Sequence, residues 1–167
     1  MMKRILPILL ILLLPQLTKA DYLNRFKCHQ NISTIENASL EFIQVESNMK
    51  WYKIGNSIAK FGEVESSIVS YMFLGGVFYG EEVGIIGNEN INKLLRYFKK
   101  KVETVYKDQN EFLVFTRPIE RKDGSWVFIM PDEVIIIRRF SVHLCQVQVL
   151  CRDLWAEYAG VPELKAK

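Results

Sequence analysis

The stretch Glu133–Gly160 constrains the fold more than any other part of the chain, because apolar residues recur through it at helical spacing. These residues stand three or four positions apart, at Ile137, Phe140, Leu144, Val147, Cys151, Leu154 and Tyr158. On an α-helix this spacing places all seven side chains on one stripe, which has to be buried. Gly160 is typical of a left-handed helix cap, and Pro162 prevents continuation. The pattern therefore predicts a long C-terminal helix, from about residue 134 to 159.

A β-hairpin is the alternative for the first part of this stretch. Val134–Ile137 is a run of β-branched residues, which lose side-chain freedom in helices and fit well in strands. Pro131 and Asp132 would then form the tip of a hairpin between Trp126–Met130 and Glu133–Ile137. We favour the helix because local propensity commonly yields to burial.

A second amphipathic helix is predicted at about residues 88–108. Its apolar face consists of Ile91, Leu94, Leu95, Phe98, Val102 and Val105. Short strands are predicted at Leu40–Val45, Lys50–Ile54, Glu111–Thr116 and Trp126–Met130. We therefore expect an α+β fold in a single domain, with short antiparallel strands packed against the amphipathic helix and the long C-terminal helix.

The first 20 residues have the three parts of a secretory signal peptide. Lys3 and Arg4 precede the apolar run Ile5–Leu14, and small residues follow around Thr18 and Ala20. The apolar run is shorter than the about 20 residues that a membrane span needs. We expect cleavage after residue 20, a globular domain at 21–160 and a tail at 161–167. The protein would then be exported to the periplasm or the extracellular space, with no transmembrane anchor after cleavage.

Removal of this segment changes the charge balance. The whole chain has 22 basic and 19 acidic residues, and three of the basic ones lie in the first 20 positions. The remaining chain is neutral overall, which gives no support for binding to nucleic acid. One helix face is nevertheless basic, with candidate partner-binding residues at Lys93, Arg96, Lys99 and Lys100. The favoured interpretation of this face is a solvated surface whose cations lie toward the C-terminal half of the helix, where the helix dipole stabilises them.

Three cysteines in an exported protein predict one disulfide bond and one remaining thiol. If Cys145 and Cys151 share a helix, six residues separate them by about 9 Å along its axis. A disulfide needs Cα atoms within about 7 Å, so Cys28 would pair with one of the two. We prefer Cys28–Cys151, because Cys151 lies on the apolar stripe.

A metal site is a less favoured interpretation of the same region. Its candidate ligands are His29, His143 and Cys145, since each histidine lies next to or near a cysteine in the sequence. Neighbouring residues rarely direct both side chains to one ion, and none of the standard zinc spacings occurs. We therefore predict no metal and no cofactor.

Two triplets match the N-glycosylation acceptor pattern, beginning at Asn31 and Asn37. They would matter only in a eukaryotic secretory pathway.

The sequence contains no catalytic motif that would indicate an enzyme. It has no Gly-x-Ser-x-Gly elbow, no phosphate-binding loop and no His-Glu-x-x-His. Our leading hypothesis is an exported, non-enzymatic protein that binds another protein, as inhibitors, immunity proteins and assembly accessories do.

A small-ligand carrier with an aromatic-lined pocket is the alternative hypothesis. Its candidate pocket walls are Trp51, Tyr52, Phe73, Phe78 and Tyr79. A third hypothesis, an enzyme that uses a cysteine or histidine, lacks any residue pattern that would activate such a nucleophile.

Overall fold

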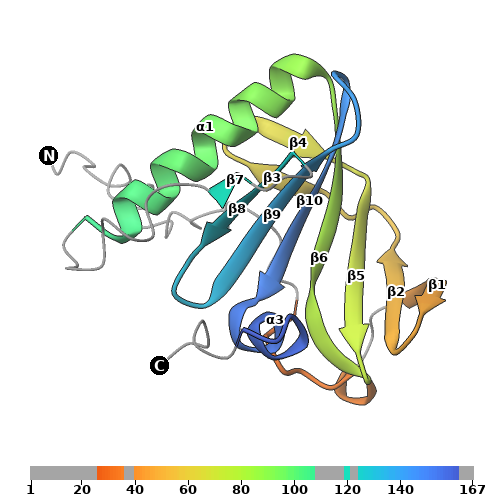
Figure 1. Cartoon of the computed structure of the whole chain (residues 1–167). Helices are drawn as coiled ribbons and strands as arrows, with labels where there is room; N and C mark the ends of the chain where they lie inside the picture. The colour runs from red at the N-terminus through yellow and green to blue at the C-terminus, as the bar shows by residue number, and fades with distance from the viewer. Residues whose placement is uncertain (1–25, 36–39, 108–118, 121–123, 162–167) are drawn as a thin grey trace, which may run out of the picture.

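The computed structural model describes residues 26–35, 40–107, 119–120 and 124–161, which form a mixed α+β structure (Figure 1). The elements in chain order are η1 (Ile32–Thr34), β1 (Leu40–Glu46), β2 (Met49–Ile54), β3 (Ala59–Phe61), β4 (Val64–Ser66), β5 (Val69–Leu74), β6 (Val77–Ile86), α1 (Asn88–Val105), β7 (Ile119–Glu120), β8 (Ser125–Ile129), β9 (Glu133–Arg139), β10 (Leu144–Cys151) and α3 (Arg152–Tyr158). The expected α+β class is confirmed.

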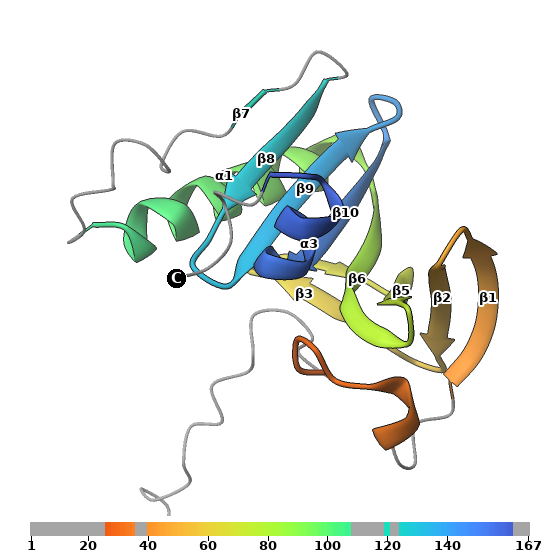
Figure 2. The same cartoon turned by 60° about the horizontal axis from the view of Figure 1, so that its bottom comes forward.

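Eight of the strands form one sheet in the order β1-β2-β5-β6-β10-β9-β8-β7, and each neighbouring pair is antiparallel. The last strand in the described part of the chain, β10, lies in the middle of this sheet between β6 and β9. Strands β3 and β4 form a separate hairpin. Figure 2 shows α1 and α3 on opposite sides of the sheet, so we call its two sides the α1 face and the α3 face.

The predicted long helix from 134 to 159 is wrong. Most of that stretch is the antiparallel hairpin β9–β10, and only Arg152–Tyr158 is helical. The β-branched run Val134–Ile137 explains why a strand forms here, because its side chains are buried alternately on the two faces of the sheet. Ile135 and Ile137 belong to the core on the α1 face, whereas Val134 and Ile136 belong to the cluster on the α3 face. A strand covered on both faces is continuously apolar, and such a run can also match helical spacing.

The alternative hairpin interpretation and the helix end are both present in the structure. Pro131 and Asp132 lie in the turn between β8 and β9. Gly160 has a φ of 69°, and the Val161 N–H donates a hydrogen bond of 2.8 Å to the Ala156 carbonyl. This is the left-handed cap expected where a helix stops before a proline.

Helix α1 covers the α1 face, as the apolar periodicity of its sequence predicts. Its buried residues are Ile91, Leu94, Phe98 and Val102. The expected range of about 88–108 compares with Asn88–Val105 in the structure. The β3–β4 hairpin packs beside α1, where the Phe61 and Phe98 rings lie 5.4 Å apart. At the other end of this face, Phe26 contacts the rings of Tyr71, Phe73 and Phe78.

The early strands agree with their predicted positions. The expected strands at Leu40–Val45 and Lys50–Ile54 correspond to β1 and β2, and Trp126–Met130 corresponds to β8. The strand expected at Glu111–Thr116 lies outside the described residues.

An irregularity in β6 places one aromatic residue on the α3 face. Phe73 pairs with Phe78, whereas Met72 pairs with Gly80, so Tyr79 is an extra residue in the β6 strand. Gly80 allows the close approach of β10 at this point, since a Cβ atom there would lie 2.4 Å from the Val149 carbonyl oxygen. The bulge turns Tyr79 into the cluster on the α3 face.

Candidate functional site

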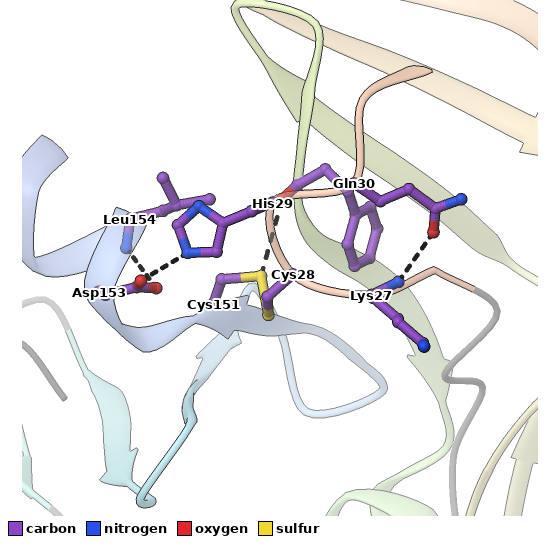
Figure 3. The surroundings of a disulfide bond; sticks show 8 residues. Lys27, Cys28, His29, Gln30, Cys151, Asp153 and Leu154 are labelled. Atoms are coloured by element: carbon purple, nitrogen blue, oxygen red, sulfur yellow. Dashed lines mark hydrogen bonds and ion pairs between the residues drawn. A yellow bond between two sulfur atoms is a disulfide. The ribbon is translucent and has the colours of Figure 1, made fainter. Parts of the chain in front are cut away.

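The disulfide bond joins Cys28 to Cys151, the pairing expected from the sequence (Figure 3). Their Cα atoms are 5.7 Å apart. A bond between Cys145 and Cys151 was excluded on the assumption that both residues lie on one helix, and that assumption is wrong. The two residues lie on one strand, where six residues span about 20 Å, so the exclusion holds for a different reason.

The candidate metal ligands do not come together. His143 lies in the turn between β9 and β10, Cys145 lies near the start of β10, and His29 lies beside Cys151 at the other end of that strand. Within the described residues no group of three histidine, cysteine, aspartate or glutamate side chains could hold a metal ion.

His29 instead contacts Asp153 in the first turn of α3 (Figure 3). Its Nε2 atom lies 2.5 Å from Asp153 Oδ2. Burial raises the pKa of the Asp153 carboxyl group, but hydrogen bonds from His29 and from the Leu154 N–H outweigh burial and lower it overall. The side chains are 53% and 37% exposed, so this pair adds no more than about 1 kcal/mol to stability. We interpret it as a support for the disulfide-linked segment.

Cys145 is a fully buried free thiol. Burial raises the pKa of the Cys145 thiol to about 11, although nearby Arg139 acts in the opposite direction. The thiol therefore stays protonated at neutral pH, and the reactive form of cysteine is the thiolate. This gives no support to Cys145 as a nucleophile.

We expect no alkylation of the folded, oxidised protein by iodoacetamide at neutral pH. After unfolding without a reductant, one alkyl group should add, at Cys145. Intact-mass measurement distinguishes these states. Alkylation in the folded state would contradict the burial of Cys145, and three alkyl groups after unfolding would contradict the disulfide bond.

The basic side chains named from the sequence lie on α1, away from the sheet. Lys93 forms ion pairs with Glu89 at 2.8 Å and with Glu63 at 3.8 Å, and the hydrogen bond to Glu89 raises the pKa of Lys93. Arg96, Lys99 and Lys100 are exposed. Lys93 is thus partly engaged within the protein, and binding by the other three cations stays a prediction.

Of the two glycosylation triplets, the structure describes the first. Asn31 is exposed, and its side-chain oxygen accepts hydrogen bonds from the Ser33 N–H at 2.9 Å and hydroxyl at 2.8 Å. Asn37 lies outside the described residues.

The five candidate pocket aromatics are divided between the two faces of the sheet. Tyr52, Phe73 and Phe78 contribute to the core on the α1 face. Trp51 and Tyr79 lie on the α3 face and line a hollow of about 340 Å³ beside α3. We call this hollow the α3 pocket. The sequence identified two of its residues and missed Trp155 and Tyr158, which had been assigned to a core helix.

A second hollow, of about 510 Å³, lies elsewhere on the α3 face. Ile43, Ile68, Phe140 and Leu144 contribute to its lining. Two further exposed apolar residues lie near it in the backbone: Ile86 pairs across the strands with Leu144, and Val142 lies in the turn before Leu144. We call these residues the apolar end; they are Ile43, Ile68, Ile86, Phe140, Val142 and Leu144.

The side chains of the apolar end are between 41% and 60% exposed. Their grouping was not predicted, since they come from β1, the approach to β5, the end of β6 and the β9–β10 turn. Ile68 is held there by close packing on Gly84, where an added Cβ atom would lie 2.9 Å from Ile68 Cγ2.

Known proteins offer no guide to these sites. No family model, curated protein or solved structure matches this chain. No helix in the described part of the chain is long and apolar enough to cross a membrane.

Proposed function

We propose that this protein is exported, is not an enzyme, and binds another protein through the apolar end. The observation that carries this proposal is a hollow lined by four exposed large apolar side chains, with exposed Ile86 and Val142 close to them along the backbone. Contiguous apolar surface of this kind commonly marks an interaction site, whereas single exposed apolar residues are ordinary.

The shape of the apolar end suits a partner that inserts an apolar side chain. The hollow lies between the β9–β10 turn, which carries Phe140, and Ile43 on the edge strand β1. A partner side chain placed there would contact Phe140, Leu144 and Ile68 together. Interfaces derive most of their energy from a few such buried apolar anchors.

The disulfide bond supports the exported part of the proposal. Disulfides persist in oxidising compartments and are rare in the cytosol. The bond between Cys28 and Cys151 joins the segment that follows the expected signal peptide to the last residue of the central strand β10.

A photo-cross-linking amino acid placed at position 140 tests the proposal in cells that produce the protein naturally. We expect one discrete cross-linked species with a second protein. The matched control is the same amino acid at Glu103, an exposed position on α1 beyond the other face of the sheet, which should give none. Once that partner is purified, Phe140→Ala should weaken binding by about tenfold or more. No cross-link at position 140, or a cross-link only to a second copy of this chain, would overturn the proposal.

A further inference from the structure

The α3 pocket has four aromatic side chains in its walls. Trp51 comes from β2, Tyr79 from the bulge in β6, and Trp155 and Tyr158 from α3. The rings of Tyr79 and Tyr158 meet edge to face, with centroids 6.0 Å apart and an angle of 69° between their planes. Aliphatic and thioether side chains complete the apolar lining, at Met49, Met72, Ile136 and Leu150.

The described lining of the pocket carries a single charge, and it is negative. Among the described residues that line it, Glu46 is the only charged one. The lining residue Gln148 donates a hydrogen bond of 3.0 Å to Glu82, a carboxylate that lines the second hollow together with Lys53. Among the described lining residues there is thus no cation that would bind a carboxylate or phosphate ligand, and the charge of Glu46 favours a positive ligand.

Aromatic walls and a carboxylate together suit an organic cation. The faces of tryptophan and tyrosine rings carry negative potential and attract cations within about 6 Å, and aromatic cages recognise quaternary ammonium groups in this way. Burial also raises the pKa of Tyr79 well above its usual value, so its phenol stays neutral. From these observations we propose that the α3 pocket binds a small organic ammonium ion with alkyl substituents.

The size of the pocket agrees with a ligand of this kind. A volume of about 340 Å³ lies at the lower end of the range for small-molecule sites, about 300–1,000 Å³. It accommodates one small molecule. The α3 pocket and the apolar end have no lining residue in common. Ligand binding in the pocket therefore does not depend on the proposed protein partner.

Two isosteric probes test the inference: choline and 3,3-dimethylbutan-1-ol, which has carbon in place of the charged nitrogen. Intrinsic fluorescence reports on binding because Trp51 and Trp155 line the pocket. We expect choline chloride to change the fluorescence saturably, with sodium chloride at equal concentration as the salt control. The uncharged probe should bind roughly tenfold more weakly, within the range of cation–π contributions. Equal binding of the two probes, or no saturable change with either, would overturn the proposal.

Two substitutions separate the contributions of charge and aromatic surface. Glu46→Gln should weaken choline binding severalfold and leave the uncharged probe unaffected. Its matched control is Glu41→Gln, an exposed carboxylate of the same strand that does not line the pocket. Tyr158→Leu keeps an apolar side chain at an exposed position but removes the ring. It should weaken the binding of choline more than the binding of the uncharged probe. If neither substitution at the pocket changes choline binding, choline binds elsewhere and the assignment is wrong.

Discussion

Replacement of both Cys28 and Cys151 by alanine is expected to lower the free energy of unfolding by about 2–5 kcal/mol. The bond closes a loop with a sequence separation of 123 residues, and the entropy that a cross-link removes from the unfolded chain increases with loop length. It also anchors Phe26, which covers part of the α1 face through contacts with Tyr71 and Phe78. Urea unfolding of the oxidised wild type and of the double variant measures the difference.

Treatment with a reductant is the control for this prediction. It should destabilise the wild-type protein to about the same extent and leave the double variant unchanged. A double variant as stable as the wild type would show that the bond contributes nothing to the folded state.

The substitution Phe98→Ala is expected to lower the free energy of unfolding by about 3–5 kcal/mol. The Phe98 side chain is fully buried between α1 and the sheet. Its ring lies 5.4 Å from that of Phe61 on the β3–β4 hairpin and 5.9 Å from that of Phe128 on β8. The cavity left by truncation would thus open between three separate elements, which limits how far the site can collapse.

Lys99→Ala provides the matched control, one position further along the same helix. The lysine is exposed, so its removal should change stability by less than about 0.5 kcal/mol. Chemical denaturation of both variants gives the comparison. A cost below about 1 kcal/mol for Phe98→Ala would contradict the packing of α1 on the sheet.

The parts of the fold that could be predicted are those whose signal is local. One face of α1 is apolar and the other is charged, so periodicity alone identifies it. The β1–β2 hairpin turns at Ser47 and Asn48, polar residues between two short strands. The cap at Gly160 was recognised from the glycine and the following proline, although the start of its helix was misplaced by 18 residues, from about 134 to Arg152.

The hairpin β9–β10 was misassigned because its burial depends on contacts far away in sequence. Val147 is buried since β6 lies on one side of it and β9 on the other, and α1 covers it. The same spacing that suggested a stripe also included Phe140 and Leu144, which are exposed in the structure. Side-chain type alone does not distinguish a strand buried on both faces from a helix.

Both candidate sites were beyond sequence reasoning for a related physical reason. The α3 pocket combines Trp51 with Trp155, which are more than a hundred residues apart, and it depends on a bulge that turns Tyr79 toward them. The apolar end joins residues from β1 to β10 that carry no pattern in common. The strand order brings the apolar end together, and the α3 pocket also needs the β6 bulge and the packing of α3 on the sheet.

The position of β10 has a consequence for how the chain is made. During synthesis from the N-terminus, the residues of β1, β2, β5, β6 and α1 are made before those of β10. Until β10 is made, the edge of β6 that pairs with it has no partner strand. Cys28 likewise remains without its disulfide partner until Cys151, the last residue of β10, is made. Pairing between distant strands is slow, and exposed strand edges favour association between nascent chains. A chain that stops before Leu144 would therefore lack the middle of its sheet and not merely one end.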